Sequence, residues 1–171
     1  MAGILSLPQD SKLALALGFR TVSKGWDLLK KMNIPHGWKV VVNSSKSHYS
    51  TEKYDVNLIT SRSNNIIDLQ KDFLEERDFS LLLYACDATL LPYRITSSSG
   101  VMFDALSHGI PFIASDLAFF KEFAEQELGI TVKRNRTAFS DGIEEIERNY
   151  SYYSQNVDKF KEKLKFIYNG L

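Results

Sequence analysis

The sequence predicts an α/β fold, a Rossmann-like three-layer arrangement with a doubly wound parallel sheet of about six strands. Short apolar runs of strand length alternate with amphipathic segments, and most of these runs lack the polar alternation of a half-exposed strand. Such alternation favours right-handed crossovers and therefore a parallel sheet covered on both faces. A length of 171 residues with 44% hydrophobic residues suits a single domain over residues 1–171.

Each element is predicted from its own run of residues. The strands are expected at 13–18, 39–43, 56–60, 88–92, 110–114 and 129–132. Helices are expected between them at 26–32, 66–74, 78–86, 101–108 and 118–127. After Thr137, apolar residues recur at helical spacing as far as Ile167, which predicts two closing C-terminal helices.

The composition excludes several classes of protein. Lys and Arg balance Asp and Glu at 21 each, and no basic run stands out, so we expect no nucleic-acid partner. Cys86 is the only cysteine, which rules out an internal disulfide and predicts a small buried apolar residue. The first seven residues lack the charged flank of a signal peptide and are interpreted as a leader into the first strand. A cytoplasmic protein is the expectation.

The segment 90–109 carries the main functional signal. It is predicted to form a strand, a polar loop and a helix, with Ser97-Ser98-Ser99-Gly100 where the helix begins. A helix start exposes N–H groups without intrahelical partners and carries partial positive charge. The serine-rich helix entry is therefore a candidate seat for a phosphate.

Topology adds cations to this seat. In a sheet of order 3-2-1-4-5-6, strands one and four are neighbours, and ligands bind beyond their carboxyl ends. The loop 19–25 supplies Arg20 and Lys24, while the loop 93–100 supplies backbone N–H groups. We therefore expect cations and oriented dipoles to converge on one anion.

Asp104 lies four residues after Gly100, on the same helix face and one turn deeper. Its carboxylate could accept hydrogen bonds from ribose hydroxyls beside the phosphate, which together would describe a nucleotide. The alternative is a structural role, with favourable placement in the helix dipole and pairing with His108. Position alone leaves both interpretations open.

Several motifs in order along the chain resemble the carboxyl-terminal donor-binding domain of GT-B glycosyltransferases. The similarity is closest to the retaining group that uses nucleotide-activated sugars, glycosyl transferases group 1 or family 4-like, and it covers nearly the whole chain. The motifs are Gly18-Phe19, KGWDLL at 24–29, ACDATLLPY at 85–93, Ser98-Ser99-Gly100, DAL at 104–106, GIP at 109–111 and ASD at 114–116.

The resemblance implies roles for matching positions in the phosphate and ribose sites. Lys24 would bind the donor diphosphate, and the backbone of Ser99, Gly100 and Val101 would cradle it, with Ser98 beside them. Asp104 stands where the family usually has a glutamate that contacts the ribose.

Other positions depart from the family pattern. Eight positions before the ribose-binding residue, the family often has a second glutamate that touches the donor sugar. Thr96 stands there in this chain, and it can form a hydrogen bond with a sugar hydroxyl but carries no charge. The family usually has an arginine directly after the glycine that ends strand one, but here Phe19 stands in that place and Arg20 follows it. Arg20 is therefore assigned to the phosphate only because it is the next residue. Glu122 lies where the family often has an acidic residue near the sugar, although a solvated helix face explains it equally well.

Transfer of a sugar builds negative charge on the leaving phosphate, which Lys24, Arg20 and the helix amino end would stabilise. This chemistry needs no metal, and the resemblance implies metal independence with a nucleotide-diphospho-sugar as donor substrate. GT-B enzymes close two domains over the reactants, so we expect a missing N-terminal acceptor domain or a partner subunit. The acceptor would belong to polysaccharide, glycolipid or glycoprotein synthesis, with at most peripheral contact to a membrane.

A second class of function is a non-catalytic α/β module. A receiver-like domain would place clustered acidic residues at the end of strand one, where this chain has Phe19 and Arg20. A nucleotide-sugar-binding partner subunit stays open as the alternative. In either case the segment 61–65, expected after strand three, would lie near the base.

Overall fold

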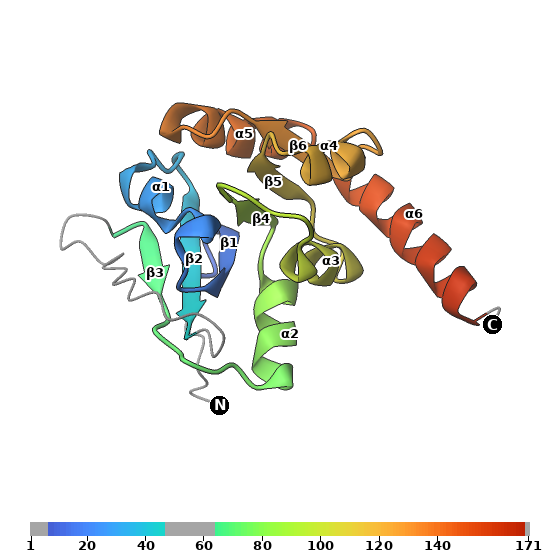
Figure 1. Cartoon of the computed structure of the whole chain (residues 1–171), viewed down its shortest axis with the longest axis horizontal. Helices are drawn as coiled ribbons and strands as arrows, with labels where there is room; N and C mark the ends of the chain where they lie inside the picture. The colour runs from blue at the N-terminus through green and yellow to red at the C-terminus, as the bar shows by residue number, and fades with distance from the viewer. Residues whose placement is uncertain (1–6, 47–63, 170–171) are drawn as a thin grey trace.

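The computed structural model describes residues 7–46 and 64–169, which are organised around a parallel sheet (Figure 1). Its six strands have the order β3-β2-β1-β4-β5-β6. The bounds are β1 Lys12–Phe19, β2 Trp38–Ser45, β3 Ile66–Asp68, β4 Ala88–Leu91, β5 Phe112–Ser115 and β6 Gly129–Val132. All neighbouring pairs are parallel, so the predicted doubly wound topology is confirmed.

Helices cover both faces of this sheet. The helical elements are η1 Val22–Lys24, α1 Trp26–Lys31, α2 Glu76–Ala85, α3 Gly100–Ser107, α4 Ala118–Ala124, α5 Arg136–Arg148 and α6 Tyr150–Asn169. Alternation along β1 explains the layers, because Ala14 and Ala16 pack in one cluster while Leu13, Leu15 and Leu17 pack in the other. The first cluster includes residues of α1 and α5, and the second includes residues of α2 and α3.

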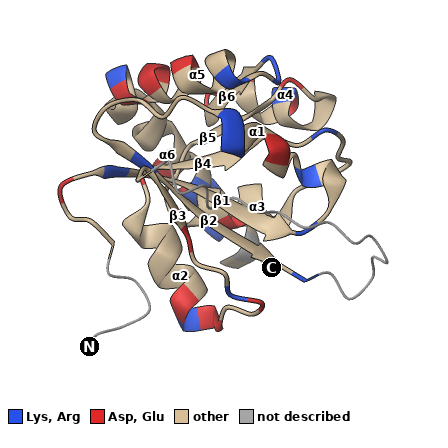
Figure 2. Ribbon diagram, turned by 90° about the vertical axis from the view of Figure 1, so that its left-hand side faces the viewer, with Lys and Arg blue, Asp and Glu red and all other residues tan. Residues whose placement is uncertain are grey.

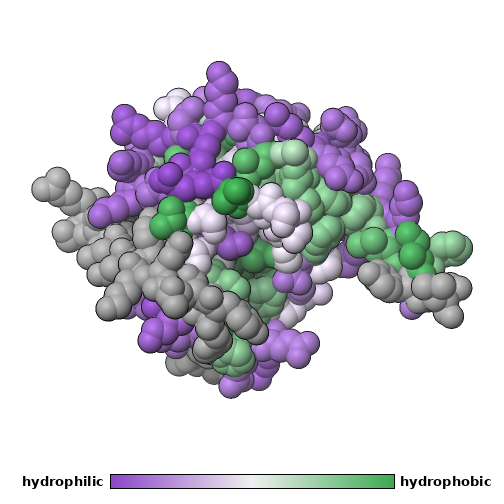
Figure 3. All heavy atoms as spheres, in the orientation of Figure 1, coloured by the Kyte–Doolittle hydropathy of each residue, from purple (hydrophilic) through white to green (hydrophobic). Residues whose placement is uncertain are grey.

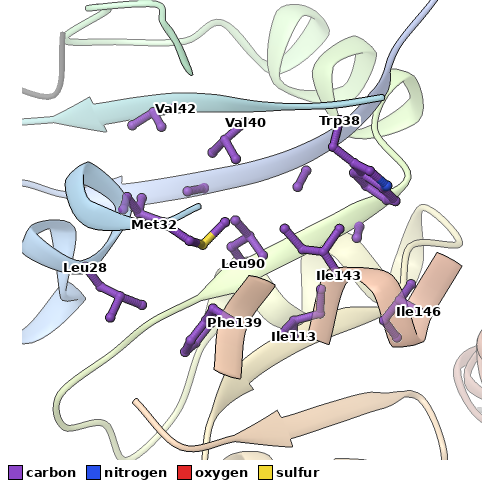
Figure 4. Packing of buried hydrophobic residues seen from close by; sticks show 14 of the residues in the cluster. Leu28, Met32, Trp38, Val40, Val42, Leu90, Ile113, Phe139, Ile143 and Ile146 are labelled. Carbon is purple, nitrogen blue, oxygen red and sulfur yellow. The ribbon is translucent and has the colours of Figure 1, made fainter. Parts of the chain in front are cut away.

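The cluster beneath α1 and α5 shows why these segments are helices. In Figure 4, Phe139, Ile143 and Ile146 of α5 point towards the sheet, where Ile113 of β5 lies, and each is fully buried. Their spacing of three and four residues places them on one helix face. Removing side chains of this size from water is the main source of stability, about 1.5–3 kcal/mol for each.

The C-terminal helix α6 packs Val157 and Phe160 against a third cluster that includes Met102 and Leu106 of α3. Beyond α3 it projects from the rest of the fold (Figure 1). No helix in the described part of the chain is long and apolar enough to cross a membrane. The charged residues of α2 gather at its start, where Glu76, Arg77 and Asp78 alternate in sign, and acidic and basic residues both lie on α5 (Figure 2).

The third strand is where the sequence prediction was wrong. Residues 66–74 were expected to form a helix, but Ile66 and Ile67 pair with Val40 and Val41 of β2, and the chain then runs as a loop to α2. The apolar residues of this segment imitate helical spacing, whereas its two β-branched isoleucines favour a strand beside β2. The strand expected at 56–60 lies outside the described residues.

This correction also moves the segment expected near the base. Just before β3 begins, the Asn65 carbonyl accepts a hydrogen bond from Val40 N of β2 at 2.8 Å. Asn64 and Asn65 therefore lie at the amino end of the strand, opposite the edge where ligands bind in such sheets. Residues 61–63 lie outside the described part of the chain.

Cys86 follows α2 and is buried, as expected. Burial, together with the neighbouring charge of Asp87, raises the pKa of its thiol to about 12. The thiol is therefore protonated near neutral pH and serves as a small apolar group.

Candidate functional site

A cavity of about 560 Å³ opens at the carboxyl ends of β1 and β2, beside the start of α3. Figure 3 shows a hollow in this region of the molecule. Four residues of its lining, here termed the polar wall, are Lys24, Ser98, Ser99 and Gly100. Four apolar residues of the lining, the apolar wall, are Leu17, Phe73, Leu74 and Phe79, and Asp104 also lines the cavity.

Lys24 ends the short helix η1, and its ammonium Nζ lies 4.1 Å from the centre of the Tyr93 ring. Burial lowers the pKa of Lys24 below its ordinary value. Among the described residues no carboxylate pairs with this ammonium. A half-buried cation held over an aromatic face is therefore available to an anionic ligand in the cavity.

The start of α3 faces the same space. The Ser99 hydroxyl caps this helix by accepting a hydrogen bond from Met102 N at 3.2 Å, and it lies 3.4 Å from the Tyr93 hydroxyl. The N–H groups of Gly100 and Val101 occupy the first helical positions and have no acceptor within the helix. A Cβ added to Gly100 would meet no atom within 4 Å, so the space beside this cavity-lining residue is open.

Asp104 is one turn further along α3 and lines the cavity, as the helical spacing predicts. The alternative pairing with His108 is not formed by the carboxylate, because His108 Nδ1 lies 2.7 Å from the Asp104 backbone oxygen and Nε2 lies 2.8 Å from Ser80 Oγ. Burial raises the pKa of Asp104, against the opposing influence of His108. Among the described residues no basic side chain forms an ion pair with the carboxylate, which is therefore available to a hydrogen-bond donor inside the cavity.

Arg20 does not line this cavity. Its guanidinium donates to the Ser44 hydroxyl and carbonyl at 3.1 and 3.0 Å and forms an ion pair with Asp72 at 3.1 Å. These contacts tie the end of β1 to β2 and to the loop after β3. A role of Arg20 in phosphate binding stays a prediction.

Two other residues expected near the sugar lie outside the cavity lining. The Thr96 hydroxyl donates to the Ser98 carbonyl and accepts from Ser98 N at 3.2 Å, which closes a tight turn. Glu122 is exposed on α4. Their contacts with a sugar stay predictions, whereas Ser98, which Thr96 supports, does line the cavity.

The apolar wall was missed by sequence reasoning, since its loop was expected to be helical. The Asn43 side chain donates to the Lys71 carbonyl at 3.1 Å and accepts from Lys71 N at 2.9 Å, which pins the loop to β2. Gln70, just before, has a positive φ of 51°. The pinned loop presents Phe73 at the cavity with 79% of the residue exposed. An Asn at the end of β2 was the available signal.

In the described part of the chain, no group of three or more His, Cys, Asp or Glu side chains gathers as a metal site would require. The polar groups of the cavity are instead the ammonium groups of Lys24 and Lys46, helix N–H groups, hydroxyls, the Asn43 amide and two carboxylates, of which Asp72 is paired with Arg20. Cations and N–H groups suit an anionic ligand, while the Asp104 carboxylate suits a ligand with hydroxyl groups.

Comparisons with known proteins identify the fold. No protein-family model matches the sequence, and no curated protein sequence matches it. Sucrose-phosphate synthase from Thermosynechococcus elongatus is similar in structure, with a TM-score of 0.69 and 17% identity over 93% of this chain and 42% of that one. HepE from Anabaena, in complex with UDP-glucose, has a TM-score of 0.64 and 13% identity over 95% of this chain and 50% of that one.

A third similar structure is itself a single domain. The C-terminal domain of LpcC, a glycosyl transferase group 1 family protein from Francisella tularensis, has a TM-score of 0.63 and 13% identity, and the match covers 92% of this chain and 87% of that one. This chain spans about half the length of sucrose-phosphate synthase and HepE, with 42% and 50% of them covered. At such low identities the likeness shows the fold, which is that of the carboxyl-terminal domain in GT-B group 1 glycosyltransferases.

Proposed function

We propose that the chain binds a nucleotide-diphospho-sugar in this cavity and is the donor half of a glycosyltransferase. One observation carries the proposal: Lys24, the start of α3 and the Asp104 carboxylate line a single cavity at the carboxyl ends of β1 and β2. Cation and helix N–H groups suit a diphosphate, and a carboxylate one turn deeper suits a ribose. The fold shared with HepE, which was solved with UDP-glucose, supports this choice of ligand.

The two walls suggest how the donor lies. The diphosphate would occupy the space between Lys24 and the N–H groups of Gly100 and Val101, while the nucleoside would extend past Asp104 to the apolar wall. The sugar would then lie towards Ser98, with Thr96 and Glu122 as proposed outer contacts. Arg20 would bind the phosphate only if its ion pair with Asp72 broke and its guanidinium turned to the ligand.

The same groups would promote transfer. Cleavage of the sugar–phosphate bond leaves negative charge on the departing diphosphate, and preorganised donors that meet this charge lower the barrier. Lys24 supplies a full positive charge and α3 supplies oriented N–H dipoles. We propose no metal in this step.

A complete enzyme would need an acceptor site. The chain covers 42% of sucrose-phosphate synthase and 50% of HepE, which supports a second domain or partner subunit that carries the acceptor. We propose that this assembly works in the cytoplasm, with at most peripheral contact to a membrane, and that residues 1–171 act as one domain in it.

The second candidate function is a non-catalytic nucleotide-sugar-binding subunit. Its support is Thr96, which stands in place of an expected acidic residue and whose hydroxyl is bonded to Ser98 in the turn. Release of free nucleoside diphosphate from a nucleotide sugar, assayed with the partner domain present, separates the two candidates. A catalytic half yields release that Lys24→Ala abolishes, and a binding subunit yields none.

Calorimetric titration tests the binding site itself. The panel contains the uridine, guanosine and adenosine diphosphates and their sugars, measured with wild type, Lys24→Ala and Asp104→Ala. Loss of one charge-assisted contact costs about 1.5–3 kcal/mol, with Lys24→Ala weakening the diphosphate part and Asp104→Ala the nucleoside part. Lys30→Ala and Asp141→Ala, at exposed positions of α1 and α5, are matched controls. Binding of none of the ligands, or binding indifferent to both site variants, contradicts the proposal.

A further inference from the structure

Three charged side chains from separate segments meet beside the polar wall. Asp27 is in the first turn of α1, Arg94 follows β4, and Arg134 follows β6. Arg94 Nη2 donates to one carboxylate oxygen of Asp27 at 2.9 Å, and Arg134 Nη2 donates to the other at 2.7 Å. None of the three lines the cavity, so they would act on it only through other residues.

Backbone contacts extend this cluster to the loops that form the polar wall. Arg134 Nε donates to the Pro92 carbonyl at 2.9 Å, and Arg134 Nη2 reaches the Gly25 carbonyl at 3.4 Å. Arg94 N donates to the Ser23 carbonyl at 2.8 Å. A Cβ on Gly25 would lie 1.8 Å from the Pro92 oxygen, so the two loops touch directly.

These contacts hold Ser23 and Gly25, the chain neighbours of Lys24, and Pro92 and Arg94, the chain neighbours of Tyr93. Lys24 Nζ lies 4.1 Å from the Tyr93 ring centre, and the Tyr93 hydroxyl lies 3.4 Å from Ser99 Oγ at the cap of α3. We propose that Asp27, Arg94 and Arg134 form a clamp that positions Lys24 and Tyr93 against the start of α3 for diphosphate binding. The ligand in this statement rests on the function proposed above; the positioning of Lys24 does not.

The charges of the clamp distinguish positioning from simple electrostatics. Two guanidinium groups surround one carboxylate, and although partial burial acts to raise it, they hold the pKa of Asp27 below its usual value. If the clamp acted by charge alone, removal of the Asp27 carboxylate would leave more positive charge and strengthen anion binding. Positioning gives the opposite result, because release of the loops separates Lys24 from the helix end.

The experiment uses the 171-residue chain with Asp27→Asn and Arg134→Lys, and Glu145→Gln as control. Glu145 is exposed about as much as Asp27 and forms an ion pair with Arg148 at 3.0 Å on α5, distant in sequence from the cavity loops. UDP and uridine are titrated by NMR. We expect Asp27→Asn to lower the affinity for UDP at least about fivefold. Arg134→Lys, which keeps the charge, should lower it by a similar factor. Uridine affinity stays within about twofold because the apolar wall is unchanged.

The clamp proposal is overturned if Asp27→Asn binds UDP as tightly as wild type or more tightly. It is also overturned if the variant loses equal affinity for UDP and uridine. Urea unfolding establishes whether each variant is folded. If Asp27→Asn does not fold, the UDP affinity of Arg134→Lys decides the outcome.

A second readout needs no ligand. The pKa of Lys24, followed by ¹³C NMR of labelled lysine, should rise towards its ordinary value in Asp27→Asn as the side chain leaves its half-buried position. Loss of a nearby negative charge alone would lower it. If wild type binds no nucleoside diphosphate, the proposed function fails, and this titration still decides the clamp: an unchanged or lower pKa overturns it.

Discussion

The two walls of the cavity are held in different ways. The polar wall is joined by backbone contacts, by Gly25 packed on Pro92 and by the ion pairs of Asp27 with Arg94 and Arg134. The loop of the apolar wall is held by the Asn43 amide, by Leu69 N, which donates to the Val42 carbonyl at 2.9 Å, and by Leu69 and Leu74, which pack against the second cluster. The phosphate side is thus joined by ion pairs and backbone contacts between loops, whereas the nucleoside side is held by one amide, a backbone bond and apolar packing.

The largest effect is expected from breaking the polar wall at Gly25. Its φ is 73°, and a methyl group would collide with the Pro92 carbonyl, so Gly25→Ala should lower the free energy of unfolding by about 3 kcal/mol or more. Gly37 is the matched control: its φ is 82°, but a Cβ there meets no atom within 4 Å. Gly37→Ala should cost only about 1 kcal/mol, the conformational part. Equal losses in urea unfolding would mean that the two loops are not in close contact.

Breaking the apolar wall at Asn43 should have a smaller effect. Asn43→Ala leaves the Lys71 N–H and carbonyl without their partner and should cost about 2 kcal/mol in unfolding free energy. Hydrogen exchange should accelerate in residues 69–75 and leave the start of α3 unchanged. Asn149→Ala, which removes an exposed hydrogen bond to Glu145, serves as control. Faster exchange on both sides of the cavity would contradict independent walls.

Phe73 allows the apolar wall to be tested without a change in stability. Phe73 and Phe166 are exposed to 79% and 81%, so substitution of either by alanine should change unfolding free energy by less than about 0.5 kcal/mol. Only Phe73 lines the cavity, and Phe73→Ala should weaken nucleotide binding by about 1 kcal/mol if its ring contacts the base. Equal affinity in the two variants, measured by calorimetry, would remove Phe73 from the site.

The smallest effect is expected from pH. Burial raises the pKa of Asp104 and lowers that of Lys24. Affinity for UDP-glucose, whose esterified diphosphate does not titrate near neutral pH, should therefore fall as acid protonates Asp104 and as base deprotonates Lys24. Because each ligand contact favours the charged form, affinity is lost on both the acid and the basic side. Asp104→Asn should abolish the acid limb alone; persistence of that limb would assign it to another group.

Local pattern was sufficient for most of the fold and for part of the site. The apolar runs of β1, β2, β4, β5 and β6 and the serine cap of α3 are signals contained in a few consecutive residues. The same holds for Asp104, which helical spacing alone places one turn from Gly100. The segment 66–74 failed for the same reason: its local pattern resembles a helix, and only pairing with β2 makes Ile66 and Ile67 a strand.

By itself the sequence determined the parallel α/β fold, the helix entry at Ser99 and two of the ionisable groups that line the cavity, Lys24 and Asp104. Only the tertiary structure decided that Arg20 pairs with Asp72, that Asn43 pins the loop carrying Phe73, and that Asp27 joins Arg94 and Arg134. The reason is physical. Periodicity and capping depend on neighbours within a turn or two, whereas Asp27 and Arg134 lie 107 residues apart and meet only because the sheet brings the ends of their strands to one edge.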